Sequence, residues 1–247
     1  MEFILASLAG TFIGAVLGFI GAGGAMLAVP ILIYVFDFQP AAATTAALAI
    51  VCAAAVSGAY PKARGKEILY KEAFFIWGLG LLTNISASLI AHRLSPAAIT
   101  TGTAIVLILA ATSMFMQPIE KTHVRISNFN LLLLSLLIGC VTGFFGIGGG
   151  FIVLPVLVLG FGTPLTIATG TSLAVIAANS LTAFIGHFAV WNQVNWSLTF
   201  VVAIGAVVVA GITSRIHSRI NPLILRRSFA IFLYLVATFT VFKTWVL

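Results

Sequence analysis

The chain alternates long apolar runs with short polar stretches. The apolar runs fall at 3–20, 25–36, 41–60, 73–91, 96–116, 129–145, 151–161, 165–190, 196–213 and 228–246. Eight of them are long enough to form substantial helices in a membrane, where a spanning helix needs about 20 apolar residues. Their continuous character excludes a β-barrel, whose strands alternate apolar and polar residues. The pattern therefore predicts an all-α polytopic membrane protein.

The two short runs are too short to span a membrane as helices. One follows the cluster Gly21-Ala22-Gly23-Gly24, and the other follows Gly146-Ile147-Gly148-Gly149-Gly150. Each short run contains a proline, Pro30 in the first and Pro155 in the second. We expect each to be a short helical segment that turns back at the glycines and forms an in-and-out pair with the preceding long helix.

Composition agrees with a membrane location. Hydrophobic residues make up 61% of the 247 residues, and charged residues only 7%. A soluble domain carries about a quarter charged residues, so a soluble enzyme, a nucleic-acid binder and a disordered chain are all excluded. The net charge of +7 is what cytoplasmic loops rich in Lys and Arg produce. The expected partner is the lipid bilayer, with no nucleic acid.

The basic residues predict the orientation in the membrane. Ten of the twelve lie in the segments 61–72, 117–128 and 214–227. The positive-inside rule makes these segments cytoplasmic. The N-terminus, the linker 191–196 and the C-terminus are then outside, and the chain is a multi-pass protein of the cell (inner) membrane.

The two halves of the chain align at an offset of 125 residues. Fifteen identities fall within positions 14–53, and both glycine clusters and both prolines align. Fixed-offset similarity indicates a duplication, with residues 1–125 and 126–247 as the two repeats. The basic segment 61–71 corresponds to 186–196, which has no Lys, Arg, Asp or Glu. The repeats are therefore predicted to be inverted, as in secondary transporters whose substrate site lies between the halves.

Interrupted helices at matching places indicate the substrate site. A helix that restarts after a turn presents free N–H groups and a positive dipole end, which favour an anion. Hydroxyl and amide side chains nearby could add to the lining. The candidate substrate-binding residues are Gly21, Ala22, Gly23, Gly24, Ala25, Thr44, Thr45, Gly146, Ile147, Gly148, Gly149, Gly150, Thr169, Thr171, Ser172 and Asn179.

Structural alternatives exist for these residues. Small residues let membrane helices approach closely, which is the favoured interpretation for Gly14, Gly18, Gly139 and Gly143. Helical Ser and Thr hydroxyls often donate to carbonyls of their own helix. Polar residues such as Asn84 and Ser180, inside apolar helices, are expected to form hydrogen bonds between helices.

Ionisable groups are almost missing from the apolar runs. Lys62 falls in the predicted cytoplasmic loop, Asp37 at a helix end and His187 near the outer interface, so no Lys or Arg is expected in the core. No His, Cys, Asp or Glu cluster has the spacing of metal ligands, and no catalytic set can be assembled. We therefore expect no enzyme activity, metal or cofactor, and a site of neutral groups that suits a small anion.

The motifs Gly18–Gly24 with Pro30, Gly143–Gly150 with Pro155, and Ala168–Leu173 resemble the TauE/SafE sulfite-exporter family. The resemblance extends over nearly the whole chain. It implies a bacterial-type inner-membrane permease for sulfite, sulfoacetate or related sulfur-containing anions. Ala25 stands where the second cluster has Gly150, so the first motif is the weaker copy.

The favoured function is a secondary transporter that exports a small sulfur-containing anion by alternating access. An anion channel is one alternative, and a membrane scaffold or assembly factor that transports nothing is another. A homodimer is left open, as are the coupling ion and the identity of the anion.

Overall fold

The computed structural model describes residues 2–21, 24–116, 128–216 and 222–245. Over these residues all regular secondary structure is helical. The helices are α1 (Glu2–Ile20), α2 (Gly24–Val35), α3 (Pro40–Arg64), α4 (Tyr70–Ala91), α5 (Pro96–Met116), α6 (Asn128–Phe145), α7 (Gly150–Pro155) with a π-helical turn (Val156–Gly160), α8 (Leu165–Gly186), a 3-10 turn (Phe188–Gln193), α9 (Trp196–Ile216) and α10 (Pro222–Trp245).

The predicted helices are confirmed, with shifts at some ends. The eight long ones are α1, α3, α4, α5, α6, α8, α9 and α10. Helix α3 continues past the predicted end at residue 60 to Arg64, and the Gly65 N–H donates to the Pro61 carbonyl at 3.0 Å. Pro155 has no N–H, so the α-helical bond to the carbonyl four residues earlier cannot form, and the chain continues as the π-helical turn.

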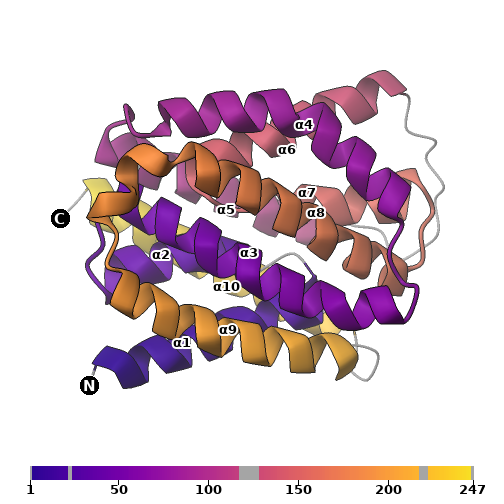
Figure 1. Cartoon of the computed structure of the whole chain (residues 1–247), viewed down its shortest axis with the longest axis horizontal. Coiled ribbons are helices and arrows are strands. Elements are labelled where there is room, and N and C mark those ends of the chain that lie inside the picture. The colour runs from indigo at the N-terminus through magenta and orange to yellow at the C-terminus, as the bar shows by residue number, and fades with distance from the viewer. Residues whose placement is uncertain (1, 22–23, 117–127, 217–221, 246–247) are drawn as a thin grey trace.

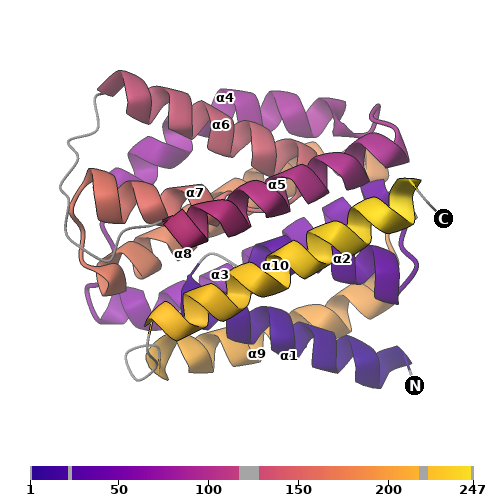
Figure 2. The same cartoon turned by 180° about the vertical axis from the view of Figure 1, so that it is seen from behind.

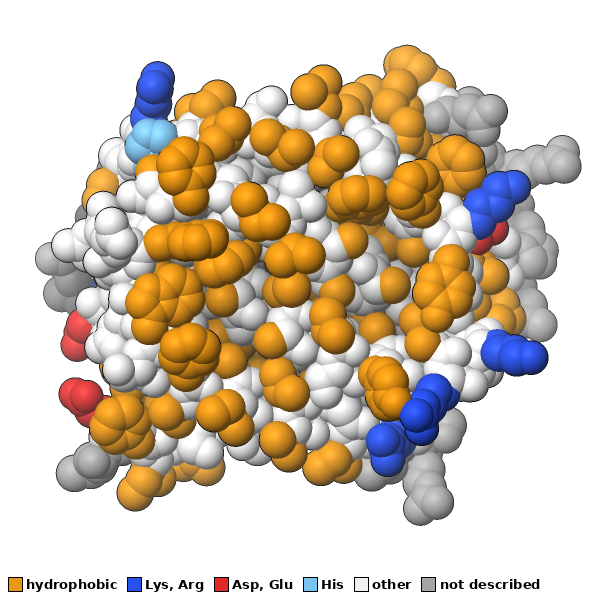
Figure 3. Space-filling view, in the orientation of Figure 1, with side chains coloured by type: hydrophobic (Ala, Val, Ile, Leu, Met, Phe, Trp, Pro, Cys, Tyr) orange, Lys and Arg blue, Asp and Glu red, His pale blue; other side chains and the backbone are white. Residues whose placement is uncertain are grey.

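The exposed surface is apolar around the middle of the molecule. Leu82, Phe200 and Leu235 are each more than 60% exposed, and Figure 3 shows hydrophobic side chains over the centre with charged ones at the two ends. Five helices of the described part, α1, α3, α4, α8 and α9, are long and apolar enough to cross a membrane. Apolar area of this extent is stable against lipid, and the chain is an all-α polytopic membrane protein.

The helices lie side by side along the long axis of the molecule (Figures 1 and 2). The two termini are at the same end, and the connection from α3 to α4 is at the opposite end (Figure 1). We call the end with the termini the terminal end, and the other the basic end. The basic end carries Lys62, Arg64, Lys66 and Lys71 on the α3–α4 connection and its flanks, and Figure 3 shows a group of Lys and Arg side chains on that side.

The two short segments form helical hairpins with the helices before them. Helix α2 has 12 residues, and α7 with its π-helical turn has 11 (6 and 5). At about 1.5 Å per residue each short arm is about 17–18 Å long, little more than half of a hydrocarbon core of about 30 Å. The hairpin α1–α2 therefore turns well inside the bundle from the terminal end, and α6–α7 does so from the basic end (Figure 1).

Contacts recur at the same 125-residue offset as the sequence identities. Gly21 lies against the side chain of Thr169 on α8, and Gly146 lies against Thr44 on α3. Position 21 corresponds to 146 and position 44 to 169, so each hairpin turn contacts the long central helix of the other half. The boundary between residues 125 and 126 lies outside the described residues.

Glycines on α1 and α6 bring long helices together, as the spacing favoured. The backbone of Gly14 lies against Ala206 on α9, and Gly139 lies against Gly80 on α4. A Cβ atom at either position would overlap a backbone carbonyl oxygen. Close packing of this kind replaces the hydrophobic driving force that lipid does not provide between helices.

The orientation can be tested with single cysteines at exposed positions 64 and 192, in a protein with Cys52 and Cys140 replaced by alanine. Arg64 lies at the basic end, and Asn192 lies in the 3-10 turn. We expect a membrane-impermeant maleimide to label position 192 in intact cells and position 64 only after permeabilisation. The reverse pattern would contradict the predicted orientation.

Candidate functional site

Left-handed backbone at the glycine turns explains the residue type there. Gly21, Gly146, Gly148 and Gly149 have φ values of 73°, 68°, 71° and 66°, a region that glycine enters without the steric cost of a Cβ atom. The Gly146 N–H donates to the Thr142 carbonyl at 3.0 Å and ends α6. The candidates Ala22 and Gly23 lie outside the described residues.

The two hairpins meet where α2 begins. A Cβ built on Gly148 would lie 3.3 Å from the Ala25 Cβ, 3.1 Å from Cγ2 of Ile176 and 3.5 Å from Oγ of Ser180. Gly24, Ala25, Ile147 and Gly150 are buried around this point. The structure therefore brings together candidates from both glycine clusters, and it adds α8 as the third wall.

Two polar groups on successive residues of α8, one of them beside Gly148, have no hydrogen-bond partner within the described part of the chain. They are the Nδ2 group of Asn179 and the hydroxyl of Ser180, both fully buried. Asn84 on α4 donates to the Asn179 carbonyl oxygen at 3.0 Å and to its Oδ1 at 3.1 Å, which orients the Asn179 amide. Asn179 is one of the predicted site residues. Ser180 is expected only to bond between helices, but its hydroxyl forms no such bond within the described residues and lies next to Gly148, a position that depends on tertiary packing.

The threonine candidates use their protons in contacts within the protein. Thr44, Thr169 and Thr171 donate to the carbonyls four residues earlier, at 2.9, 2.7 and 2.8 Å. The Thr45 hydroxyl lies 2.9 Å from the Ala41 carbonyl oxygen and 3.1 Å from Nδ1 of His187, and its proton serves one of these two acceptors. A hydroxyl has one proton, so in this arrangement these groups offer only lone pairs. Ser172 donates to the Gly150 carbonyl over 3.4 Å and joins α8 to the start of α7. In this structure the threonine hydroxyls therefore donate within the protein, which is the structural role considered above as the alternative to substrate binding.

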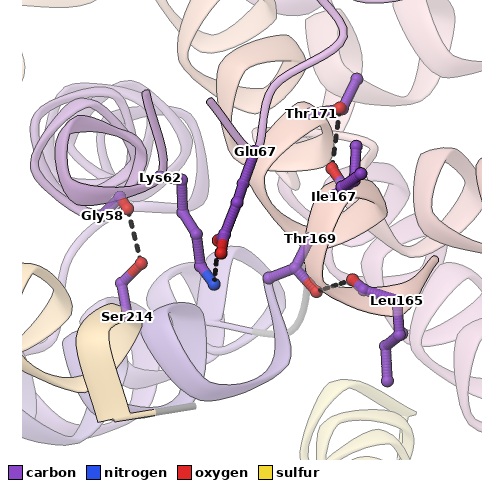
Figure 4. A network of polar contacts seen from close by, with 8 residues as sticks. All are labelled: Gly58, Lys62, Glu67, Leu165, Ile167, Thr169, Thr171 and Ser214. Carbon is purple, nitrogen blue, oxygen red and sulfur yellow. Dashed lines mark hydrogen bonds and ion pairs between the residues drawn. The ribbon is translucent and has the colours of Figure 1, made fainter. Parts of the chain in front are cut away.

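Lys62 is buried, contrary to the expectation that it lies in a loop. Because α3 continues to Arg64, Lys62 is part of its last turns and is only 7% exposed. Its Nζ lies 2.8 Å from Oε2 of Glu67, as Figure 4 shows. Among the described residues it is the one Lys, Arg, Asp or Glu in the buried class. The burial of Lys62 could not be predicted from the sequence, because Pro61 and the neighbouring charged residues are typical of a loop.

His187 occupies the corresponding position toward the terminal end, since 62 and 187 differ by 125. Its ring is 3% exposed, with Nε2 2.8 Å from the Gly143 carbonyl and Nδ1 3.1 Å from the Thr45 hydroxyl. It therefore joins α8, α6 and α3. His187 follows the spanning part of α8, and burial lowers its pKa below the usual value, so the ring is neutral at pH 7 and can donate to Gly143 through Nε2.

A cleft of about 530 Å³ opens at the terminal end. Asp37 and Gln39 from the α2–α3 connection line one side, and Gln193 and Asn195 line the other. Ala42 also lines the cleft and precedes Thr45 on α3 by about one helical turn. The cleft therefore approaches the contact between Thr45 and His187. Within the described ranges, no group of three His, Cys, Asp or Glu side chains could hold a metal ion.

Comparison with known proteins identifies the family. The model of the sulfite exporter TauE/SafE family matches residues 6–240. The chain belongs to this family. No solved structure gives a significant match.

Curated relatives are named as transporters. A probable membrane transporter protein of Xylella fastidiosa (strain Temecula1) is 25% identical over 96% of this chain and 94% of its own length. The probable membrane transporter protein YunE of Bacillus subtilis is 26% identical over 83% of this chain and 85% of its own length. A similarly named protein of Methanocaldococcus jannaschii is 33% identical, over 42% of this chain. The family and these names make this chain a membrane transporter.

Replacing His187 by alanine should destabilise the protein. The substitution removes the group facing the Gly143 carbonyl, and a buried acceptor without a partner costs about 1–3 kcal/mol. Thermal unfolding in detergent is measured by tryptophan fluorescence. We expect a lower midpoint temperature for His187→Ala than for His92→Ala, which changes an exposed histidine. Equal midpoints for the two variants would show that the His187 contacts add nothing to stability.

Proposed function

We propose that this protein is a secondary transporter that exports a small sulfur-containing anion, such as sulfite or sulfoacetate, across the inner membrane. The observation that carries the proposal is the buried, unpartnered hydroxyl of Ser180 beside the point where the two hairpins meet, with a second unpartnered donor, Nδ2 of Asn179, on the preceding residue of α8. Buried polar groups are rarely left without a partner. A substrate that accepts hydrogen bonds would satisfy the Ser180 hydroxyl.

The chemistry of this point favours an anion. An amide N–H group can only donate, and a hydroxyl can donate, whereas sulfite and sulfonate oxygens accept. Helix α2, of 12 residues, begins at Gly24 next to Ala25, and the positive end of its dipole adds to the preference. Neutral hydrogen-bond donors bind an anion less tightly than a fixed positive charge does, and weaker binding suits a substrate that must be released on the other side of the membrane.

Alternating access is supported by the paired arrangement of the hairpins. The contacts of Gly21 with Thr169 and of Gly146 with Thr44 relate the two halves, as expected for inverted repeats over 1–125 and 126–247. Each hairpin enters from a different end (Figure 1). Movement of one half against the other would expose the meeting point first to one side and then to the other. The termini and the 191–196 linker are proposed to face outside.

Two other functions remain as outcomes of experiment. A channel would conduct the same anion without alternating access, and a scaffold or assembly factor would not bind it. The place of the unpartnered Ser180 hydroxyl, beside Gly148 where the hairpins meet, favours binding over a scaffold, and the unpartnered Ser135 hydroxyl does not share this place.

Ser180→Ala should weaken sulfite binding about fivefold, which corresponds to the loss of one hydrogen bond of about 1 kcal/mol. Binding is measured by calorimetry on the purified protein in detergent. The matched control is Ser135→Ala, because the Ser135 hydroxyl is also buried and unpartnered but lies on α6 well before its glycine turn. Equal affinities of the two variants would place the anion elsewhere.

Counterflow distinguishes a carrier from a channel. Proteoliposomes preloaded with unlabelled sulfite should take up radiolabelled sulfite faster than empty ones, because a carrier returns its site more quickly when loaded. A channel would show no stimulation from the opposite side. Absence of any flux, with no binding, would favour the scaffold.

A further inference from the structure

We propose that Lys62 is a docking site for the transported anion at the basic end. In the absence of the anion the Glu67 carboxylate pairs with the Lys62 ammonium, and the anion displaces it on binding. The inference rests on the proposed anion transport and deepens it. It assigns a binding residue outside the central donors, at the membrane face that the basic segments predict to be cytoplasmic.

The burial of the two partners is unequal. The Lys62 side chain is 8% exposed, whereas that of Glu67 is 37% exposed. A buried ammonium needs an anionic partner, because an isolated charge in a protein interior is costly. The carboxylate comes from the surface and can return to water at low cost. A sulfite or sulfonate oxygen arriving from that side can therefore take its position without leaving the ammonium unpaired.

Lys62 lies beside the start of α8, on the way to the first hairpin turn. Its Cβ is 3.0 Å from a Cβ built on Gly170. Figure 4 shows the Lys62 and Thr169 side chains directed into the same space between α3 and α8. Thr169 in turn lies against Gly21. Lys62 thus lies against the residue next to Thr169, and Thr169 contacts the glycine turn.

The ion pair between Lys62 and Glu67 also lies in the segment that covers the basic end of α8. The backbone carbonyl of Glu67 lies against Gly170, and the Leu69 N–H donates to the Thr171 hydroxyl at 3.0 Å. The segment after α3 therefore rests on the first turns of α8. Displacement of the Glu67 side chain would remove the one ion pair from this covering segment, so anion docking and opening of the basic end would occur together.

The terminal end has a different closure. Positions 62 and 170 correspond to 187 and 45, and there His187 faces the Thr45 hydroxyl instead of a carboxylate. A neutral contact gives an incoming anion no charged group to displace. We therefore expect the Lys62 effect at the basic end alone.

The test is radiolabelled sulfite transport at constant ionic strength in everted and right-side-out vesicles, which present opposite faces. For Lys62→Gln we expect a half-saturating sulfite concentration at least about tenfold higher when sulfite meets the basic end, the scale of a charge-assisted hydrogen bond. From the other face we expect a change below about twofold, because the proposed site lies at one end. Glu67→Gln should lower the value at the basic end severalfold.

Lys71→Gln is the matched control, since it removes an exposed positive charge near the same connection. If Lys62→Gln fails to fold, the double change Lys62→Gln with Glu67→Gln removes both charges and should show the same weakened binding. Three results would overturn this inference but not the proposed function. They are the same half-saturating sulfite concentration for Lys62→Gln and Lys71→Gln, an equal change for Lys62→Gln from both faces, and no tighter binding for Glu67→Gln. Absence of sulfite flux in the unmodified protein would overturn the proposed function as well.

Discussion

Backbone N–H and C=O groups cannot be left bare in hydrocarbon, and this requirement is concentrated at the two turns that begin at Gly21 and Gly146. Each turn interrupts a helix well inside the bundle, so protein must cover it. The cover comes from the long central helices, with Thr169 of α8 over Gly21 and Thr44 of α3 over Gly146. The buried positions of α3 and α8 beside the turns, and the place of the candidate site, follow from this need.

The backbone contacts of the two hairpins recur at the 125-residue offset, but the polar side chains beside them do not. Ser180 lies beside Gly148 of the second hairpin and Asn179 precedes it on α8, whereas the corresponding positions 55 and 54 are buried alanines. The same helix positions therefore provide donors in one half and close packing in the other. Polar groups beside one of the two hairpins support the proposed single substrate position rather than two equivalent ones.

The ends of the molecule differ in the same way. At the basic end a charged pair, Lys62 with Glu67, lies under the segment that rests on α8. At the terminal end His187 joins three helices through neutral hydrogen bonds. A charged closure responds to ions in the adjacent solution, whereas a neutral closure depends mainly on packing and hydrogen bonds. This difference between the two ends is the basis of the proposed anion docking at Lys62.

The sequence by itself determined the all-helical membrane class, the eight long helices and the two short segments, because continuous apolar runs and glycine clusters are local signals. It also indicated the close approach of helices at Gly14 and Gly139. Only the tertiary structure decided which polar groups are free: helix geometry directs the threonine protons to carbonyls of their own helices, while packing leaves Ser180 unpartnered next to Gly148. The burial of Lys62 likewise depended on contacts with Gly170 on another helix, and no local pattern of residues encodes a neighbour more than 100 positions away.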